Sequence, residues 1–326
     1  MARKVILDCD PGLDDALAIL LAAGDARVEL VGVTTVAGNQ TLDKTTLNAR
    51  RVLGLAGMLD VPVVAGCEAP IVRPLLTARH IHGESGLDGP SLKEDLIAPL
   101  APGHGVDFIV ETVMSSAPGE VTLVPTGPLT NVAMAVRREP RIVGRVAEVV
   151  LMGGSYTRGN RTPAAEFNIL VDPEAAAIVF GQAWPLTMVG LDVTNKAVAG
   201  QDVLLRLEHL GSAVGDAVRE MLDFYSTTYS EVYGFDQGPP VHDPCAVAQV
   251  IDDRVLSLQL ACVQVETKGE WTTGMTVVDF SGRARQPNAK VATSIDVGLF
   301  WDLMIAGLSQ LPRGVQVEPV VDSHGR

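Results

Sequence analysis

Four aspartates crowd into one short segment near the N-terminus, which contains Asp8, Asp10, Asp14 and Asp15. Carboxylates this close repel one another, and such crowding is tolerated mainly when a cation neutralises the charge. No cluster of histidine or cysteine lies beside them, which favours calcium or magnesium over zinc or copper. The segment therefore predicts a site for a hard divalent cation. The alternative is that the last two aspartates only favour a helix N-terminus and the first two are solvated.

The elements that must position these aspartates are short β-branched runs alternating with helical segments. This pattern predicts the α/β class, with an open, mostly parallel, Rossmann-like central sheet flanked by helices and an active site at the carboxyl ends of the strands. The expected strands are residues 4–7, 28–35, 61–65, 121–125, 148–152, 186–191, 258–266 and 275–280. The expected helices are residues 14–23, 42–55, 106–115, 129–137, 173–180 and 297–308, with a further helical region within 211–243.

The residues just past the expected strands are polar. Asp8 and Asp10 follow the first strand, Asn39 follows the second, and Thr126 ends a later strand. Because ligands bind at the carboxyl ends of the strands in open α/β sheets, we expect these groups to meet at one rim.

Composition limits the classes of function. Hydrophobic residues make up 47% of the chain, which predicts a globular fold, and we expect one domain over residues 1–326. A net charge of −14 argues against nucleic acid as a partner. The N-terminus lacks the apolar core of a signal peptide, and no apolar run could span a bilayer, so a cytoplasmic location is expected. The four cysteines lie far apart and form no CxxC pair, so we expect them to be reduced.

The segment from Asp8 to Ala16, DCDPGLDDA, resembles the N-terminal signature of the inosine-uridine nucleoside hydrolase family. The resemblance continues nearly to the end of the chain through VAGN, TGPLTN, MGG, EFN and VHD, which begin at Val36, Thr126, Met152, Glu166 and Val241. It implies a calcium-dependent enzyme that hydrolyses the N-glycosidic bond of inosine, uridine and related ribonucleosides, and that assembles as a homotetramer or homodimer.

The resemblance also implies a set of site residues. Calcium would be held by Asp10, Asp15, the Thr126 carbonyl and Asp243. Read without the family, Thr126 could be an ordinary turn residue and Asp243 the N-cap of a helix. The residues expected to contact substrate are Asp14, Asn39, His82, Met152, Asn160, Glu166, Phe167, Asn168, Tyr225 and Tyr229.

Two residues are expected to be catalytic. Asp10 is the candidate general base for the attacking water, and direct attack predicts inversion at C1′. His242 is the candidate acid for the departing base, because histidine titrates near neutral pH. His82 lies on an expected mobile loop, where a plain surface histidine is an equally good interpretation. Tyr225 and Tyr229, at helical spacing, could line the base pocket or could pack in the core.

Two alternatives remain at this stage. Asp8 and Asp10 superficially fit the Asp-x-Asp arrangement of a haloacid-dehalogenase-like phosphatase, although the Pro11-Gly12 that follows and a missing candidate lysine do not. A non-catalytic calcium-dependent binding protein for nucleosides or ribose is the second alternative. Loss of Asp10 or Asp14 would have favoured it, and both are present.

Overall fold

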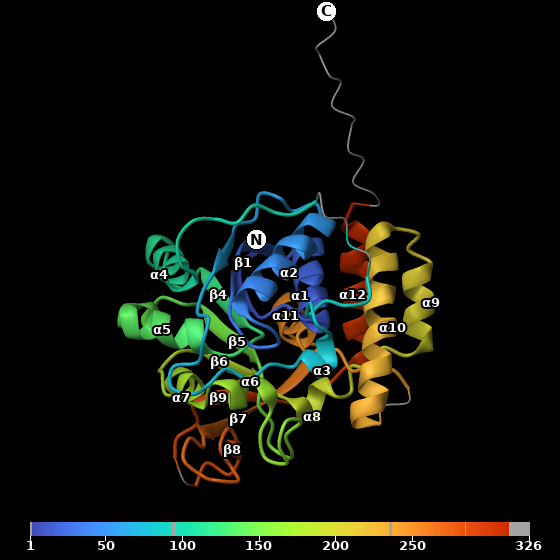
Figure 1. The fold of residues 1–326 in the computed structure, drawn as a ribbon. Helices are drawn as coiled ribbons and strands as arrows, with labels where there is room; N and C mark the ends of the chain where they lie inside the picture. Colours follow the sequence, from blue (N-terminus) through green and yellow to red (C-terminus); the bar gives the residue numbers. More distant parts are fainter. Residues whose placement is uncertain (1, 91, 93–95, 235–236, 284, 313–326) are drawn as a thin grey trace, which may run out of the picture.

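A single mixed sheet forms the centre of the molecule. The computed structural model describes residues 2–90, 92, 96–234, 237–283 and 285–312. Within these residues nine strands run in the order β3-β2-β1-β4-β5-β6-β9-β7-β8, with helices on both faces (Figure 1). The strands are β1 (Arg3–Cys9), β2 (Val28–Thr35), β3 (Val63–Ala65), β4 (Val121–Pro125), β5 (Glu148–Met152), β6 (Leu186–Val189), β7 (Leu256–Val265), β8 (Thr276–Asp279) and β9 (Ala289–Ile295).

Strand pairing is parallel from β3 to β9, and β7 pairs antiparallel with both β9 and β8. The expected α/β class with a mostly parallel sheet is therefore confirmed. Parallel strands need crossover connections, and the chain supplies helices for them. The carboxyl ends of β1, β2, β4, β5 and β6 consequently face one edge of the sheet, which is where polar residues follow the strands.

The helices form one layer on each face of the sheet. They are α1 (Leu13–Gly24), α2 (Leu42–Leu55), α3 (Arg79–His82), α4 (Gly105–Ser115), α5 (Thr130–Arg138), the 3-10 helix η1 (Pro140–Gly144), α6 (Phe167–Val171), α7 (Pro173–Phe180), α8 (Leu191–Thr194), α9 (Gln201–Glu208), α10 (Ala213–Tyr233), α11 (Pro244–Ile251) and α12 (Val297–Gln310). Two large apolar clusters lie between these layers and the sheet, one around α1, α11 and α12 and the other around α4, α5 and α7. Buried apolar side chains in these clusters fix the direction of α1, whose first turn carries Asp14 and Asp15.

The expected strand at residues 186–191 is partly wrong. The strand β6 ends at Val189, and Leu191 begins the single turn α8. The amide of Leu191 donates to the carbonyl of Gly154, and the amide of Thr194 donates to that of Gly190, so backbone hydrogen bonds override the β-branched character of this run. Helix α9 and strand β9 were not expected.

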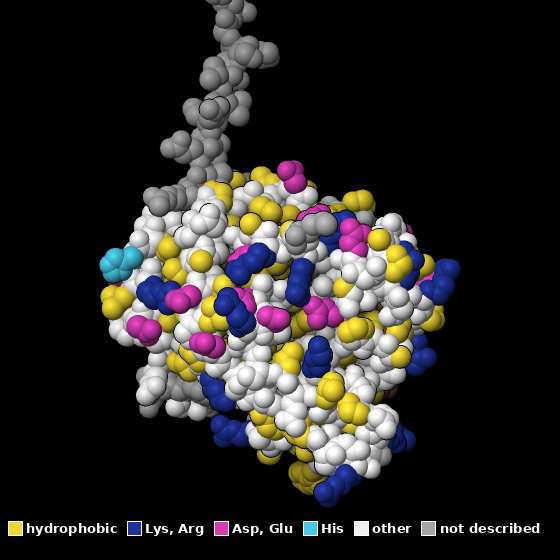
Figure 2. Space-filling model, turned by 180° about the vertical axis from the view of Figure 1, so that it is seen from behind, with side chains coloured by type: hydrophobic (Ala, Val, Ile, Leu, Met, Phe, Trp, Pro, Cys, Tyr) yellow, Lys and Arg dark blue, Asp and Glu magenta, His cyan; other side chains and the backbone are white. Residues whose placement is uncertain are grey.

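One face of the molecule carries side chains of both charges. On the face opposite the view of Figure 1, Lys and Arg side chains are interspersed with Asp and Glu and do not gather into one basic patch (Figure 2). Among the described residues, no helix is long and apolar enough to cross a membrane.

Candidate active site

A pocket lies at the carboxyl edge of the sheet and brings together most of the residues expected from the sequence. Those that line it are Asp14, Asn39, His82, Thr126, Met152, Asn160, Glu166, Phe167, Asn168, Tyr225, Tyr229, His242 and Asp243. The two other expected residues, Asp10 and Asp15, are not part of the lining, and each is fully buried. Loops after β1, β2, β4 and β5 meet here with helix α10 and the start of α11.

Three carboxylates form a compact cluster at the pocket. Ligand atoms of Asp14, Asp15 and Asp243 lie within 4.8 Å of one another. The first two belong to the first turn of α1, and Asp243 stands at the N-cap position of α11. Its side chain makes no capping hydrogen bond there, so the N-cap interpretation does not explain this aspartate. Asp10 is not a member of this compact group.

Asp15 is held rigidly by donors on both of its oxygens. The hydroxyl of Thr126 donates to Oδ1 at 2.8 Å, while the amide of Gly12 and Nδ2 of Asn39 donate to Oδ2 at 3.1 and 3.2 Å. Burial and, after it, the charge of Asp14 raise the pKa of Asp15 to about 7, although the hydrogen-bond donors oppose the shift. The ionised form of this carboxyl is therefore costly until a cation is added.

One side-chain oxygen of Asp10 accepts a hydrogen bond, and the other is left open, without a partner among the described residues. The amide of Asn39 donates to its Oδ2 at 2.6 Å. Its Oδ1 is buried and, among the described residues, has no hydrogen-bond partner. Burial raises the pKa of Asp10, and the charge of Asp15 adds to the shift. A Cβ atom on Gly127 would lie 2.5 Å from this Oδ1, so only glycine allows the loop after β4 to pass so close.

The donor set suits a hard cation. It combines three clustered carboxylates, an unpartnered buried oxygen of Asp10 and the Thr126 carbonyl, which already accepts a hydrogen bond from Nδ2 of Asn168 at 2.7 Å. Oxygen-only sites of this kind bind calcium or magnesium, and a buried polar atom without a partner is costly unless something binds it. The residues present therefore fit a divalent ion.

Glu166 and Asn168, one carboxyl and one amide side chain, form a second polar group on the pocket wall. Glu166 precedes α6, and its carboxylate accepts hydrogen bonds from the amides of Gly154, Asn168 and Ile169 at 2.8–3.1 Å. Burial raises the pKa of Glu166 to about 6, although these donors oppose the shift. Asn160 is fixed nearby, because its Oδ1 accepts from the amide of Phe167 at 3.0 Å. Such a fixed array of donors and acceptors is what recognition of sugar hydroxyls requires.

His82 is not a surface histidine. Its side chain is buried, and its Nδ1 accepts a hydrogen bond from the amide of Leu13 at 3.2 Å. An Nδ1 that accepts cannot carry a proton, so the neutral ring carries its proton on Nε2. Burial lowers the pKa of His82 to about 4, which agrees with a neutral ring. A Cβ atom on Gly12 would lie 2.6 Å from this Nδ1, so the glycine lets the ring dock on α1.

An aromatic wall completes the pocket. Tyr225 and Tyr229 lie on α10 with ring centroids 4.7 Å apart, and Tyr225 stacks on His82 at 5.5 Å. The Tyr229 hydroxyl lies 2.7 Å from Nε2 of His242, and Oγ1 of Thr194 lies 2.8 Å from Nδ1 of the same ring. Burial lowers the pKa of His242, while the charge of Asp14 opposes that shift. The two tyrosines thus belong to the apolar core and also face the pocket.

Sequence reasoning missed several residues of the pocket. His80 and Arg161 also line it, and Nη1 of Arg161 lies 3.1 Å from Nε2 of His80. Tyr233, which continues the four-residue spacing of Tyr225 and Tyr229 in the sequence, lines it too. The only sequence signal for His80 was its place two residues before His82, and for Arg161 its place directly after Asn160. Thr194 was missed because it belongs to none of the matching motifs.

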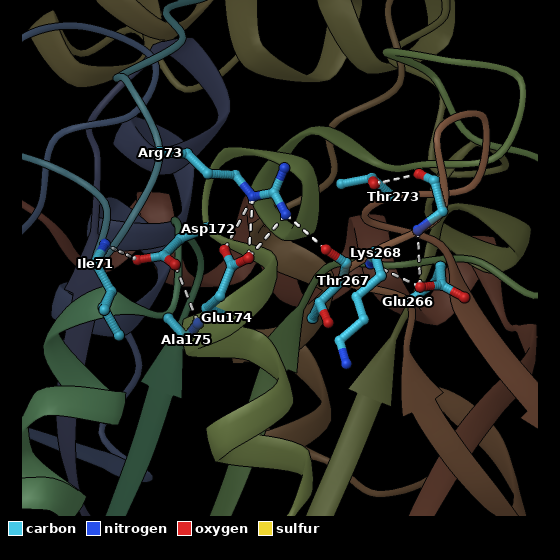
Figure 3. Close-up of polar contacts among 10 residues, drawn as sticks. Ile71, Arg73, Asp172, Glu174, Ala175, Glu266, Thr267, Lys268 and Thr273 are labelled. Carbon is cyan, nitrogen blue, oxygen red and sulfur yellow. Dashed lines mark hydrogen bonds and ion pairs between the residues drawn. The ribbon is translucent and has the colours of Figure 1, made fainter.

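The chain segment that leads into α3 is anchored at its start. The amide of Ile71 donates to Asp172, and the guanidinium of Arg73 donates to Glu174 and to the carbonyl of Thr267 (Figure 3). These contacts tie the segment to the start of α7 and to the chain beyond β7. They hold the approach to His82 in place from outside the pocket.

Comparison with known proteins agrees with this geometry. Residues 5–302 match the family described as inosine-uridine preferring nucleoside hydrolase. The chain is 50% identical over 312 residues to an inosine-uridine preferring nucleoside hydrolase of Leishmania major, covering 95% of this chain and 99% of the relative. It is 45% identical over 303 residues to a pyrimidine-specific ribonucleoside hydrolase of Escherichia coli, covering 93% and 96%.

Comparison with solved structures also leads to nucleoside hydrolases. The structure of a purine-preferring ribonucleoside hydrolase from Gardnerella vaginalis superposes with a TM-score of 0.88 at 31% identity, covering 94% of this chain and 98% of the other. Family and fold together favour a nucleoside hydrolase, which cleaves an N-glycosidic bond, over a haloacid-dehalogenase-like phosphatase, which cleaves a phosphate ester. With a match that spans nearly the whole chain and a pocket built from the matching motifs, this protein belongs to the inosine-uridine preferring nucleoside hydrolase family.

Proposed function

We propose that this enzyme hydrolyses purine and pyrimidine ribonucleosides, including inosine and uridine, to free base and ribose by direct displacement with water. One observation carries the proposal: the buried carboxylates and the pair formed by Tyr229 and His242 share a single pocket. Hydrolysis of an N-glycosidic bond needs a base for water at C1′ and an acid for the leaving group. The pocket itself offers the acid, and the candidate base is Asp10, which lies outside the lining but accepts a hydrogen bond from the amide of the lining residue Asn39 and keeps an unpartnered Oδ1.

Calcium is the proposed ion, with Asp10, Asp15, Asp243 and the Thr126 carbonyl as the residues that would hold it. When bound, calcium would supply positive charge that favours ionisation of a water and orients the ribose diol. The open Oδ1 of Asp10 and the three clustered carboxylates support this proposal. Calcium accepts 6–8 oxygen ligands in irregular geometry, which suits a site completed by substrate.

The proton transfers belong to the protein's own side chains. Asp10 would accept a proton from the attacking water on its open Oδ1, and attack on the face opposite the base gives inversion. A departing purine would take a proton from the Tyr229 hydroxyl, which His242 would replenish through Nε2. Its partner Tyr225 would help orient a purine ring by stacking.

The ribose would be read by the polar wall. Asp14 and Asn168 would bind the 2′ and 3′ hydroxyls, Asn160 and Glu166 the 5′ hydroxyl, and Asn39 would lie beside them. Each of these groups lines the pocket, and the network around Glu166 already fixes its carboxylate. A missing sugar hydroxyl would leave such a buried group unpaired, at a cost of about 1–3 kcal/mol.

The remaining contacts concern the base and the upper side of the sugar. Met152, Phe167 and His82 line the pocket and would contact the substrate there. The Nε2–H of His82 makes it a hydrogen-bond donor and not an acceptor. Assembly as a homotetramer or homodimer and a cytoplasmic location remain predictions from the sequence.

The deciding experiment measures release of ribose and base from inosine, uridine, adenosine and cytidine, before and after removal of divalent metal. We expect turnover that a chelator abolishes and that added calcium restores. Asp10→Asn is the matched variant, since it keeps the size of the side chain and removes the base. Full activity of the metal-free enzyme would overturn the calcium proposal. Substrate binding without ribose release by the wild type would favour the non-catalytic alternative.

A further inference from the structure

Thr194 contacts the candidate acid from a place outside the motifs of the family match. It ends α8, just after the carboxyl end of β6, and its side chain is fully buried. Its Oγ1 lies 2.8 Å from Nδ1 of His242, while Nε2 of the same ring lies 2.7 Å from the Tyr229 hydroxyl. Both ring nitrogens are therefore engaged by hydroxyl groups, one on each side.

The backbone around this contact is rigidly paired. The amide of Val241 donates to the carbonyl of Ala197 at 3.0 Å, and the amide of Ala199 donates to that of Pro239 at 2.9 Å. These bonds place the segment after α8 alongside the segment that carries His242. The amide of His242 also donates to Oδ2 of Asp14 at 3.3 Å. The distance between Thr194 and the imidazole is thus set by main-chain contacts on both sides.

Proton bookkeeping assigns a role to each nitrogen. If Tyr229 gives its proton to the leaving nitrogen of the base, the electron pair of the broken C1′–N bond departs with the base. His242, which must carry hydrogen on both nitrogens before this step, then returns its Nε2 proton to Tyr229. The water that forms the new C1′–O bond gives its proton to Asp10. Loss of the Nε2 proton leaves a neutral ring only if Nδ1 keeps its own proton, since otherwise an imidazolate would form. An acceptor for Nδ1–H is needed throughout.

We propose that Thr194 is a positioning residue that accepts a hydrogen bond from Nδ1–H of His242 and so directs Nε2 toward Tyr229. The inference rests on the proposed role of His242 as the source of the proton. A hydroxyl oxygen can accept this bond, and the fork of two hydroxyls also fixes the rotation of the ring. Thr194 touches neither substrate nor the reacting atoms, so it acts only through the histidine.

The test compares Thr194→Val, which keeps the shape of the side chain and removes the acceptor, with Thr194→Ser, which restores it. Inosine needs a protonated leaving group, whereas p-nitrophenyl riboside releases a stable anion. We expect Thr194→Val to lower kcat for inosine roughly 10- to 100-fold, as loss of an orienting partner does elsewhere, with little change for p-nitrophenyl riboside. Thr194→Ser should recover most of the inosine activity.

The control variant is Thr46→Val on α2, which removes a buried hydroxyl that lies 2.7 Å from the hydroxyl of Thr35 at the end of β2. It should leave the ratio of the two substrates unchanged. Equal losses of Thr194→Val on both substrates, or failure of Thr194→Ser to restore inosine turnover, would overturn the inference. A wild type that releases no ribose would instead overturn the proposed function.

A second measurement does not depend on turnover. Nitrogen-15 NMR of histidine-labelled enzyme distinguishes which ring nitrogen carries hydrogen, and His242→Gln identifies the signals of this ring. We expect hydrogen on Nδ1 of His242 in the calcium-loaded wild type whether or not Nε2 is also protonated, and a fraction of rings without hydrogen on Nδ1 in Thr194→Val. A wild-type ring with bare Nδ1 would show that Thr194 donates instead of accepting, which contradicts the assigned role.

Discussion

Calcium should stabilise the fold more strongly as the pH rises, and Asp15 supplies the magnitude. Burial raises its pKa from 3.8 to about 7 in the folded protein without metal. A carboxyl whose folded pKa exceeds its unfolded value stabilises the fold fully below the unfolded value. That stabilisation is lost as the pH rises through the folded pKa, here between about 4 and 7. Ionising Asp15 in the metal-free fold therefore costs on the order of 4 kcal/mol by pH 8.

A bound divalent cation removes this cost, because it compensates the ionised carboxylate. The increase in the free energy of unfolding caused by calcium should thus grow by roughly 3 kcal/mol between about pH 5 and about pH 8, because the rest of the cost arises below pH 5. For a chain of this length, about 3 kcal/mol corresponds to a shift in Tm of roughly 4 °C. The assay is thermal unfolding at fixed free calcium and in chelator, repeated across this pH range.

Subtracting the free energy of unfolding in chelator from that in calcium, at each pH, isolates the titration of groups near the ion. Burial raises the pKa of Asp8 to about 6, and burial lowers that of His82 to about 4, but neither is a proposed ligand, so both contributions should largely cancel. Asp15→Asn should flatten the pH dependence of the calcium effect. Asp172→Asn, a buried aspartate away from the cluster, is the matched control and should not. A calcium effect that stays constant or shrinks with rising pH would refute the reasoning.

Three further predictions concern turnover. Asp10→Asn should lower kcat by about 10²–10⁴-fold while the protein stays folded, and near-native kcat would exclude it as the base. His242→Ala should damage hydrolysis of inosine far more than that of p-nitrophenyl riboside, whereas parallel losses would assign the ring to positioning of ribose or metal. The double variant Tyr225→Thr with Tyr229→Gln should selectively lower kcat/KM for inosine relative to uridine, and equal losses for the two nucleosides would show that these tyrosines only pack.

Much of the fold followed from apolar periodicity and turn residues. Strands β2, β4 and β5 and helices α2 and α7 have the bounds expected from the sequence. The expectation failed where a tertiary contact decides the local conformation. Strand β9 has a burial pattern that alternates only in part, and its place between β6 and β7 comes from pairing with residues far away in the sequence. A run such as residues 289–295 therefore carries too weak a local signal to predict.

The site divides in the same way, as His82 and Thr194 illustrate. Aspartates crowded in one short segment indicate a cation site from the sequence alone, because their mutual repulsion must be compensated whatever the fold. The role of a histidine in a loop cannot be inferred until the position of the loop is known. His82 becomes interpretable only in the folded structure, where Gly12 leaves room for its ring against the amide of Leu13. Thr194 is an ordinary buried threonine until the pairing around Val241 brings Nδ1 of His242 to its hydroxyl. Residues that act on substrate can thus be proposed from their types and spacing, whereas residues that orient other side chains emerge only from the fold.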